Sequence, residues 1–474
     1  MRNLTMMTDL YQLTMMYGYY KCDMLGNRAV FDMFYRQTSE VTSYAVAAGL
    51  EQLIDYIENL HFEESDIEYL RSLNLFDEGF LDLLRHFHFS GDIQAVPEGT
   101  MVFPGEPLVR VSAPIFEAQL VETSLLNIIN HQTLIATKAS RVAEAAQGDM
   151  VMEFGLRRAQ GPDAGIYGAR AAVIGGCSST SNVLTGQMFG VPISGTHAHS
   201  WVMSFPDEIS AFRAYARCFP DACLLLVDTY NVLKSGMPNA ITVFKELRAQ
   251  GHEPLGIRLD SGDLAYLSRE ARRMLDEAGF PNAKICVSGD LDEYLIRDLK
   301  LQGARIDTWG VGTKLITSSD CPALGGVYKL AAEIVDGQIV NKIKLTENPA
   351  KVTNPGIKKL LRIYSKADGK AVADLIALES EIYDEREPLY LFDPVDTWKD
   401  MTLTDYTIRE LQVPVFKDGV RVYDSPSLRE ICEYARREKD SFWDQYKRLL
   451  NPHRYKVDLS EKLWMLKQNM LKHK

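Results

Sequence analysis

The chain has 474 residues and a formal net charge of −12 at pH 7, with 46% hydrophobic and 24% charged residues. This composition is typical of a globular protein with two or three domains, and the acidic balance excludes non-specific binding to nucleic acid or to anionic membranes. The first twenty residues contain no signal-peptide core, and no apolar run approaches membrane-spanning length. We therefore expect a soluble protein with no nucleic-acid or membrane partner.

The seven cysteines are scattered along the chain and form no C-x-x-C pair. Several of them lie inside apolar runs, as small core residues do. This usage is typical of a reducing compartment, so we expect a cytoplasmic protein. Neither the cysteines nor the histidines show zinc-site spacing, and we predict no metal ligand from the protein.

Residues 1–140 are predicted to form an N-terminal α/β domain. Amphipathic spacing predicts helices over 44–59 and 66–73, and Ser65 and Glu68 have capping-box spacing at the start of the second helix. A stretch punctuated by Pro and Gly follows residue 90 and predicts several strands.

Residues 141–330 alternate short apolar runs with amphipathic helical patterns. β–α units repeated about every 30 residues predict a parallel sheet, either a barrel or a doubly wound sheet. No Gly-x-Gly-x-x-Gly fingerprint is present, which favours an irregular TIM-like β/α barrel. The predicted strands are 151–154, 193–196, 223–227, 255–259, 284–287 and 306–311.

The remainder of the chain is predicted to contain two hairpins and a helical end. The hairpins turn at Asp336-Gly337 and Asp368-Gly369, dipeptides that favour tight turns. We assign residues 331–395 to the completion of the N-terminal domain. Residues 396–474 are rich in Lys, Arg and Glu and are predicted to form a helical C-terminal region.

Polar side chains follow every predicted strand of the barrel domain. In chain order they are Arg157; Thr196, His197 and His199; Asp228; Arg258 and Asp260; Ser288, Gly289 and Asp290; and Gly312 and Thr313. Helix caps and turns account for Asp, Ser, Thr and Gly, but not for arginines and histidines. Because parallel strands end at one edge of a sheet, where α/β proteins carry their chemistry, we expect a functional site there.

The turns after the last two predicted strands resemble a phosphate cradle. Ser288-Gly289-Asp290 and Gly312-Thr313 place glycines between a strand and a helix. Glycine lets backbone N–H groups approach a ligand closely, and a helix N-terminus favours anions.

The fourth strand end joins an arginine to two carboxylates. Arg258 lies among apolar neighbours and needs an anionic partner, such as a substrate carboxylate or phosphate. Asp260 is suited to ribose hydroxyls or to Mg²⁺ held by a pyrophosphate. Asp263 is predicted to cap the following helix.

The second strand end carries two histidines. His199 beyond a strand can act as acid, base or nucleophile, and Asp228 at the next strand end is placed to orient its imidazole. In an extended segment His197 and His199 lie about 6.5 Å apart, so only one is expected to reach the reacting centre.

Together these motifs resemble the nicotinate phosphoribosyltransferase family. The matching segments are 8–15, 31–36, 44–51, 153–157, 195–200, 227–230, 258–264, 288–290, 310–313, 324–330 and 345–349. They cover nearly the whole chain and occur in the family's order. The resemblance implies a quinolinate-transferase-like fold, with an irregular β/α barrel and an N-terminal α/β domain.

The resemblance also implies a reaction. Nicotinate and 5-phosphoribosyl 1-pyrophosphate would give nicotinate mononucleotide and pyrophosphate, with ATP hydrolysed alongside and Mg²⁺ as cofactor. This is a C–N bond-forming ligase reaction and the first step of NAD salvage from nicotinate.

By the same similarity, roles transfer to individual residues. His199 would be phosphorylated by ATP; Tyr11, Thr196 and Arg258 would contact nicotinate; Thr313 would contact the phosphoribosyl donor; and Gly289 and Asp290 would lie at its phosphate. Phe154 or Tyr11 can stack on the pyridine ring, and we assign Arg157 to the nicotinate site as well. No role transfers to His197, whose position varies in the family.

The N-terminal tyrosine of related enzymes reaches the active site of the partner subunit, which implies a homodimer with shared sites. On spacing alone, Tyr11 would be a packing aromatic on an amphipathic helix. Two alternative functions remain open: a nicotinamide phosphoribosyltransferase, and a catalytically silent phosphosugar-binding barrel.

Overall fold

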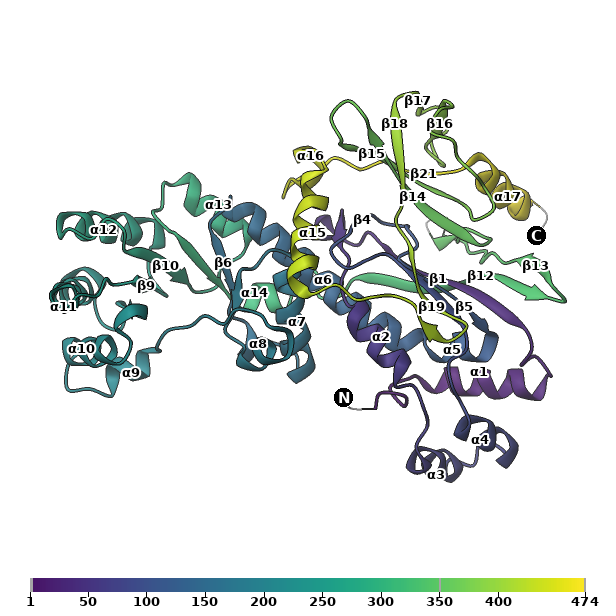
Figure 1. The fold of residues 1–474 in the computed structure, drawn as a ribbon, viewed down its shortest axis with the longest axis horizontal. Coiled ribbons are helices and arrows are strands. Elements are labelled where there is room, and N and C mark those ends of the chain that lie inside the picture. Colours follow the sequence, from purple (N-terminus) through teal and green to yellow (C-terminus); the bar gives the residue numbers. More distant parts are fainter. Residues whose placement is uncertain (1–2, 349–350, 473–474) are drawn as a thin grey trace. The chain divides into compact units, whose positions relative to one another are not determined.

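The computed structural model describes residues 3–348 and 351–472, so Pro349 of the matching segment 345–349 lies outside the described residues. The chain divides into two compact units. Unit 1 comprises residues 1–134 and 323–474, and unit 2 comprises residues 135–322 (Figure 1). The long helix α6 (Glu122–Ala146) contains the first boundary between them.

Unit 2 is built on a parallel six-stranded sheet with the strand order β7-β6-β11-β10-β9-β8. The strands are β6 (Met150–Glu153), β7 (Ser179–Thr180), β8 (Leu224–Leu226), β9 (Gly256–Leu259), β10 (Lys284–Ser288) and β11 (Thr308–Val311). The helices are α7 (Pro162–Ile174), α8 (Val183–Phe189), α9 (His199–Met203), α10 (Glu208–Cys218), α11 (Met237–Ala249), α12 (Leu264–Glu277), α13 (Glu293–Leu301) and α14 (Thr313–Ile316).

The β–α units of this sheet follow local sequence signals. The Asp263 side chain accepts a hydrogen bond from the backbone N–H of Tyr266 and caps α12, as predicted. Gly279 follows this helix with a φ of +85°, a left-handed conformation that glycine adopts without strain. The buried stripe of α12 includes Leu264, Ala271 and Leu275, which turn one face of the helix toward the core.

The predicted strand 193–196 is wrong. Ile193 makes a single parallel bridge to Thr180, and the strand that pairs with β6 at this edge is β7. Pro192 and Gly195 flank the short apolar stretch; a proline has no N–H for a ladder, and a glycine weakens a strand.

Unit 1 contains an antiparallel seven-stranded sheet, ordered β13-β12-β1-β5-β3-β19-β20, a four-stranded sheet, ordered β18-β14-β15-β21, and two strand pairs, β16-β17 and β2-β4. The strands are β1 (Arg28–Arg36), β2 (Ala45–Val46), β3 (Asp92–Ala95), β4 (Met101–Val102), β5 (Val109–Pro114), β12 (Gly325–Val335), β13 (Gln338–Asn341), β14 (Lys358–Ser365), β15 (Ala371–Leu378), β16 (Leu389–Phe392), β17 (Asp400–Leu403), β18 (Tyr406–Glu410), β19 (Val413–Lys417), β20 (Val420–Arg421) and β21 (Val457–Leu459).

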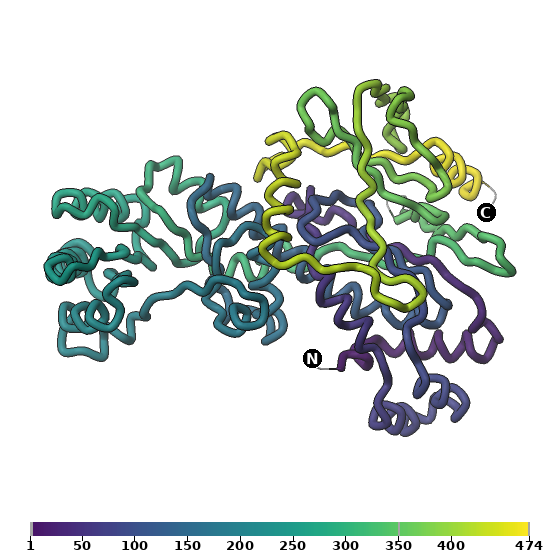
Figure 2. The backbone as a smooth tube through the Cα atoms, in the orientation of Figure 1, coloured from purple at the N-terminus to yellow at the C-terminus, as the bar shows by residue number. Residues whose placement is uncertain are grey.

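Helices complete unit 1. They are α1 (Leu10–Lys21), α2 (Leu50–Glu58), α3 (Glu64–Ser72), α4 (Glu78–Arg85), α5 (Ile115–Leu120), α15 (Leu428–Asp440), α16 (Asp444–Lys447) and α17 (Glu461–Lys472). Strands from both ends of the sequence lie side by side here, since β12 pairs with β1 and β19 pairs with β3 (Figure 2).

Local predictions for unit 1 are partly confirmed. Both hairpins form, with Asp336, Gly337 and Gly369 at positive φ. The helix predicted over 44–59 begins only at Leu50, because Gly49 adopts a φ of +103° after strand β2. The second helix starts at Glu64 with Glu63 as its N-cap, two residues earlier than the Ser65 signal predicted.

The C-terminal region differs from the helical prediction for residues 396–474. Strands β17 to β20 occupy most of residues 400–421, and helix begins only with α15. Within 400–404 and again within 405–409, apolar side chains alternate with polar ones, a period-two pattern that favours strands over the local excess of charge.

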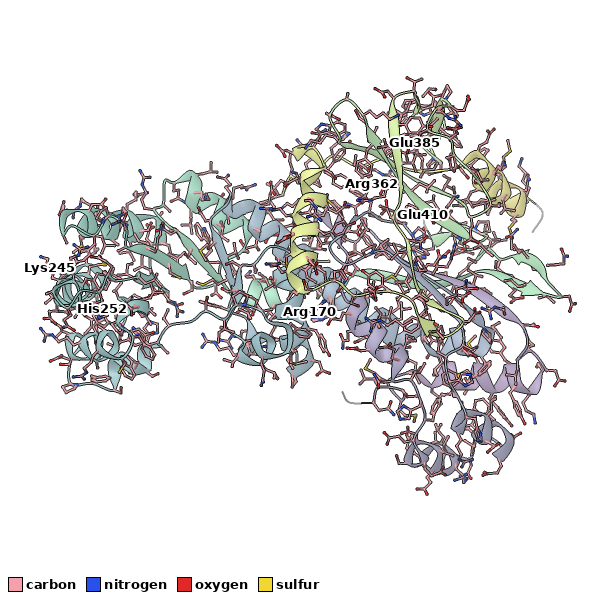
Figure 3. All side chains as sticks on the ribbon, in the orientation of Figure 1. Arg170, Lys245, His252, Arg362, Glu385 and Glu410 are labelled. Atoms are coloured by element: carbon pink, nitrogen blue, oxygen red, sulfur yellow. The ribbon has the colours of Figure 1, made fainter. Side chains whose placement is uncertain are left out.

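A buried ion cluster fixes α15 to the four-stranded sheet. Arg362 on β14 is fully buried, and its Nη2 lies 2.6 Å from Asp374 Oδ2 on β15 (Figure 3 labels Arg362). Its Nη1 donates to Glu438 on α15 at 2.9 Å. Removing one partner of such a buried pair costs about 3–5 kcal/mol, so this cluster ties the C-terminal helix to the sheet.

Candidate active site

The carboxyl ends of five neighbouring strands, β6, β11, β10, β9 and β8, carry most of the predicted site residues. All neighbours in this sheet are parallel, so these ends share one edge of unit 2. We call this edge the polar rim. Contacts link its side chains from β6 to β8.

Phe154 forms the β6 end of the polar rim. Its backbone N–H donates to Val311 O at 2.8 Å, which holds the residue against β11. A Cβ on Gly310 would lie 2.6 Å from the Phe154 ring, so glycine leaves the space that the ring occupies. The Arg258 guanidinium lies 5.6 Å from the ring centroid. An aromatic face and a cation therefore stand side by side.

Arg258, Ser288 and Asp260 form a hydrogen-bonded group in the middle of the polar rim. Arg258 Nε donates to Ser288 Oγ at 2.9 Å, and Arg258 Nη2 lies 2.9 Å from Asp260 Oδ1. The Ser288 hydroxyl also donates to Asp260. Burial alone would raise the pKa of Asp260, but the Ser288 hydrogen bond and the Arg258 charge outweigh it and lower the pKa. Asp260 is thus held as a carboxylate.

Asp228 connects this group to His199. Its side chain is 2% exposed; Oδ1 lies 3.1 Å from His199 Nε2, and Oδ2 accepts from Asp260 N at 2.9 Å and from Ser261 Oγ at 2.7 Å. A carboxylate only accepts hydrogen bonds, so His199 carries its proton on Nε2. The predicted pairing of Asp228 with His199 is present, and Nδ1 is the ring nitrogen with a free lone pair.

His197 lies beside His199 in sequence but not in the same environment. It is 8% exposed, and its Nε2 accepts a hydrogen bond from Leu226 N–H at 3.2 Å. Burial is the main cause that lowers the pKa of His197 to about 4, with Arg258 and His199 acting in the same direction and the Ala198 carbonyl opposing them. His197 is thus buried, whereas the His199 side chain is 40% exposed.

The turns after β10 and β11 form the other part of the polar rim. Gly289 has a φ of +103°, and a Cβ there would lie 2.3 Å from Asp260 O, so only glycine fits this approach of two turns. Asp290 follows at a φ of +44° and is exposed. Gly312 precedes Thr313, the first residue of the short helix α14. Partly exposed backbone and side chains are thus available to an anion.

Three predicted residues lie apart from these contacts. Arg157 is exposed in a short 3₁₀ turn after β6. The Thr196 hydroxyl donates to the carbonyl of His197 at 3.1 Å. Tyr11 lies on α1 of unit 1 and is 47% exposed.

Sequence reasoning missed Ser261 and Glu153. Ser261 donates to Asp228, as described above, and the sequence pattern assigned it no role. Glu153 is fully buried; it accepts from Thr180 Oγ1 at 2.6 Å and from Gly155 N–H, and burial raises its pKa. These bonds hold the turn that carries Phe154. The sequence signal that could have identified Glu153 is a charged residue at the end of an apolar strand.

Within residues 3–348 and 351–472, no three His, Cys, Asp or Glu side chains gather in a way that could hold a metal ion. In the same part of the chain, no helix combines the length and apolar character needed to cross a membrane.

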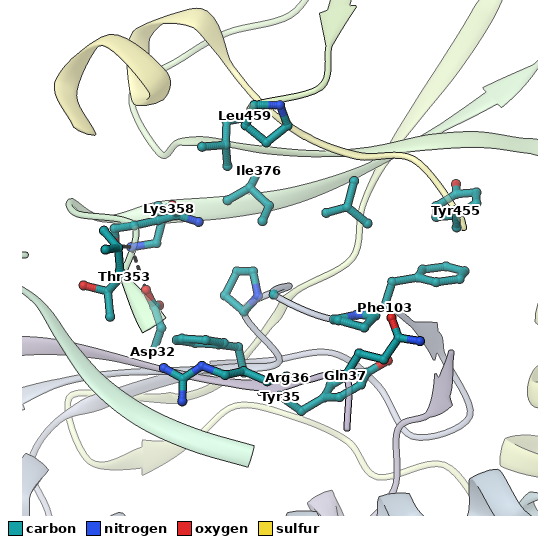
Figure 4. Close-up of a pocket in the computed structure, with 18 of the residues that line it drawn as sticks. Asp32, Tyr35, Arg36, Gln37, Phe103, Thr353, Lys358, Ile376, Tyr455 and Leu459 are labelled. Carbon is teal, nitrogen blue, oxygen red and sulfur yellow. Dashed lines mark hydrogen bonds and ion pairs between the residues drawn. The ribbon is translucent and has the colours of Figure 1, made fainter. Parts of the chain in front are cut away.

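A cavity of about 600 Å³ lies in unit 1, away from the predicted residues (Figure 4). Its lining includes the basic side chains of Arg36, Lys329, Lys358, Arg454 and Lys467. The carboxylate in this lining, Asp32, pairs with Lys358 at 2.7 Å. The combination of imidazole, paired carboxylates and arginine lies on the polar rim and not in this cavity, and we assign the chemistry to the rim.

Fold and site together define an α/β protein with its reactive groups at the carboxyl edge of a parallel sheet. Residues 6–130 match the nicotinate phosphoribosyltransferase (NAPRTase) N-terminal domain, and residues 357–467 match the nicotinate phosphoribosyltransferase C-terminal domain. The chain belongs to the nicotinate phosphoribosyltransferase family.

Individual relatives match over nearly their whole length. The chain is 48% identical to the nicotinate phosphoribosyltransferase of Bacillus subtilis (strain 168), over 99% of this chain and 95% of that protein. It is 33% identical to the Homo sapiens nicotinate phosphoribosyltransferase, over 97% and 95% respectively. The crystal structure of human nicotinic acid phosphoribosyltransferase superposes with a TM-score of 0.86 at 31% identity, covering 98% of this chain and 99% of that one.

Proposed function

We propose that this protein is a nicotinate phosphoribosyltransferase that converts nicotinate and 5-phosphoribosyl 1-pyrophosphate to nicotinate mononucleotide and pyrophosphate. Family membership supports the reaction. The observation that carries the assignment is the continuous set of contacts along the polar rim, from Phe154 through Arg258 and Asp260 to Asp228 and His199.

Nicotinate would bind between Phe154 and Arg258. The pyridine ring can stack on Phe154, with its carboxylate directed to the guanidinium. Two donor positions of Arg258 already bind Ser288 and Asp260, and Nη1 has no hydrogen-bond partner within the described residues. That nitrogen is left for the substrate carboxylate. Thr196, Arg157 and the partner subunit's Tyr11 would complete the nicotinate site.

The phosphoribosyl donor would lie along the turns after β10 and β11. Ser288, Gly289, Asp290, Gly312 and Thr313 would hold its phosphates, and Asp260 would orient its ribose. The pyridine nitrogen attacks C1′ as the C1′–O bond to pyrophosphate breaks, and the ribose acquires oxocarbenium character. Mg²⁺ would enter with the donor, because the described residues offer no metal cluster of their own, and it would neutralise the leaving pyrophosphate.

ATP coupling would proceed through His199. The Asp228 carboxylate holds the Nε2 proton and leaves Nδ1 to attack the γ-phosphorus of ATP, which releases ADP and forms a phosphohistidine. Water later takes the phosphoryl group as phosphate. The His199 side chain is 40% exposed, which leaves it accessible to the nucleotide. With this coupling the enzyme is a C–N bond-forming ligase at the entry of NAD salvage.

We further propose a cytoplasmic homodimer with shared active sites. Cys22, Cys218, Cys223 and Cys286 are free thiols, as cytoplasmic cysteines generally are. Tyr11 is exposed on α1 together with Leu10 and Met15, an apolar surface suited to a second copy of the chain.

Turnover with nicotinate and nicotinamide side by side tests the assignment. Nicotinamide lacks the carboxylate that Arg258 would bind, so we expect a kcat/KM lower by about tenfold to a hundredfold, the loss of one charge-assisted hydrogen bond of roughly 1.5–3 kcal/mol. Comparable kcat/KM for the two bases would contradict a nicotinate enzyme, and no turnover of either would favour the silent phosphosugar-binding protein.

Replacement of His199 tests the coupling. After incubation with ATP and Mg²⁺ we expect an acid-labile, base-stable phosphate on His199. His199→Ala should lose the ATP stimulation and keep a slow ATP-independent transfer, because the phosphate turns and Arg258 remain. ATP stimulation that survives in His199→Ala would rule out this route.

A further inference from the structure

The polar rim ends at a gap in the sheet, and His197 lies in that gap. The sheet of unit 2 has β7 at one edge and β8 at the other. The segment from Ile193 to His197 touches both edges: Ile193 bridges to Thr180 of β7, and the His197 ring bonds to Leu226 of β8. Its backbone pairing is confined to the β7 edge, where Ser194 N donates to Thr180 O at 2.9 Å and Thr180 N donates to Pro192 O at 3.1 Å.

The His197 ring bonds to the open side of β8. Val227 N donates to Arg258 O of β9. Since neighbouring N–H groups of a strand point to opposite sides, Leu226 N points away from β9. In a closed sheet a carbonyl of the next strand would accept this N–H. Here the acceptor is His197 Nε2 at 3.2 Å, so a side chain replaces the missing strand.

Hydrogen bonding fixes the His197 ring in one neutral tautomer. An N–H donor requires an unprotonated Nε2, so the proton resides on Nδ1, which lies 3.5 Å from Ala198 O. The ring packs against Tyr215 and Phe212 on α10, with centroid distances of 4.7 Å and 6.4 Å. The pKa near 4 agrees with a ring that stays neutral in the cell.

The two histidines contact β8 and the residues after it with matching spacing. His197 bonds to Leu226 and His199 bonds to Asp228, so the two histidines and their two partners are each separated by two positions. A shift of the segment by one residue would move both contacts together.

We propose that His197 is a positioning residue: by pinning the segment before α9 to the edge of β8, it sets His199 against Asp228. The inference deepens the proposed function, because it explains what orients the histidine that ATP would phosphorylate. It also assigns different tasks to the two histidines: His197 is a hydrogen-bond acceptor, and His199 is the nucleophile.

Two substitutions separate the hydrogen bond from the bulk of the ring. His197→Gln keeps an acceptor oxygen at about the reach of Nε2, whereas His197→Leu has none. In His197→Leu we expect the Leu226 amide to exchange its hydrogen faster by about fivefold, the effect of one ordinary hydrogen bond. We also expect phosphorylation of His199 to slow by about a hundredfold, since misplacing a reacting group by 1 Å has effects of this size. His197→Gln should restore both.

His252→Leu is the matched control, because His252 lies in unit 2 and bonds to Asp221 away from the polar rim. It should leave both measurements unchanged. Unchanged Leu226 exchange in His197→Leu, or His199 phosphorylation at the wild-type rate, overturns the inference, and so does phosphate found on His197. If wild-type protein carries no phosphate, the proposed coupling fails instead, and the exchange comparison between Leu and Gln still decides whether His197 pins the segment.

Discussion

At the scale of single residues, Asp228 organises the candidate site. Its two oxygens accept from His199, from the backbone of Asp260 and from Ser261, so one buried carboxylate ties the ends of β8 and β9 to the histidine. This arrangement lets the strand ends act as a unit. Substitutions along the polar rim are therefore expected to be non-additive.

Asp260→Asn tests whether the central carboxylate takes part in the reaction. The amide keeps the shape of the side chain but loses the charge that balances Arg258 and that would orient the ribose. We expect kcat to fall by about a hundredfold to a thousandfold with the thermal unfolding temperature little changed, as when a preorganised electrostatic group is removed. Steady-state kinetics and a melting curve measure both.

Asp263→Asn provides the control for this substitution. Asp263 undergoes the same chemical change three residues away and only caps α12, a role that Asn performs equally well. It should keep normal turnover. Near-normal turnover in Asp260→Asn would show that the Asp260 carboxylate takes no part in the reaction and that Asp260 is only a turn residue.

The sequence predicted the members of the site better than their contacts. Polar residues after apolar runs identified Asp228, Arg258 and Asp260, because parallel strands end at one edge. It did not predict that Asp260 pairs with Arg258 Nη2, nor that the His197 side chain is buried. Both features depend on side-chain geometry across strands.

At the scale of secondary structure, a buried carboxylic acid adjoins the ion cluster around Arg362. Glu106 is fully buried, and Oε2 accepts from Phe103 N–H at 2.8 Å. Burial, and then the neighbouring negative charge of Asp374, hold the pKa of Glu106 well above its usual range. The folded chain therefore holds the proton of this carboxyl to a higher pH than the unfolded chain does, and between the two pKa values folding takes up a proton.

Glu106→Gln tests this proton uptake. A carboxyl whose pKa is raised by folding contributes stability that is complete below its unfolded pKa and is lost as the pH rises toward its folded pKa. The advantage of the Gln variant over wild type should thus grow above about pH 4.3, by up to about 1.4 kcal/mol per pH unit. Urea unfolding at pH 5, 6, 7 and 8 measures it. Glu410→Gln serves as the exposed control (Figure 3), and equal slopes for all three proteins would refute a raised pKa of Glu106.

Element types were predictable wherever local signals agreed. The hairpins at Asp336-Gly337 and Asp368-Gly369 form because turn chemistry and strand alternation point the same way. The segment 193–196 has Ile193 as its one apolar residue, with Pro192 before it and Gly195 inside it, and the C-terminal strands carry enough charge to resemble helix. The C-terminal segments form strands because they pair with strands distant in the sequence, as β19 does with β3.

At the scale of the whole molecule, the residues assigned to nicotinate come from both units. Tyr11 belongs to unit 1, whereas Phe154 and Arg258 belong to unit 2. In the proposed homodimer each active site combines the rim of one subunit with the N-terminal helix of the other. Such a site requires the assembled dimer, and its activity would fall on dilution into monomers.

Mixing two impaired variants at a nicotinate concentration that limits both tests the shared site. Tyr11→Ala removes the stacking ring and should raise the KM for nicotinate, while Arg258→Ala removes the carboxylate partner. In a hybrid dimer, the Tyr11→Ala subunit supplies an intact Arg258, and the Arg258→Ala subunit supplies an intact Tyr11, so one of the two sites has neither change. We expect the mixture, after subunit exchange, to recover up to about a quarter of wild-type activity, because random pairing makes half of the dimers hybrids with one restored site each. Native mass spectrometry of the mixture establishes how many hybrids form. Hybrids without recovered activity would mean that Tyr11 serves its own chain or packs at the surface.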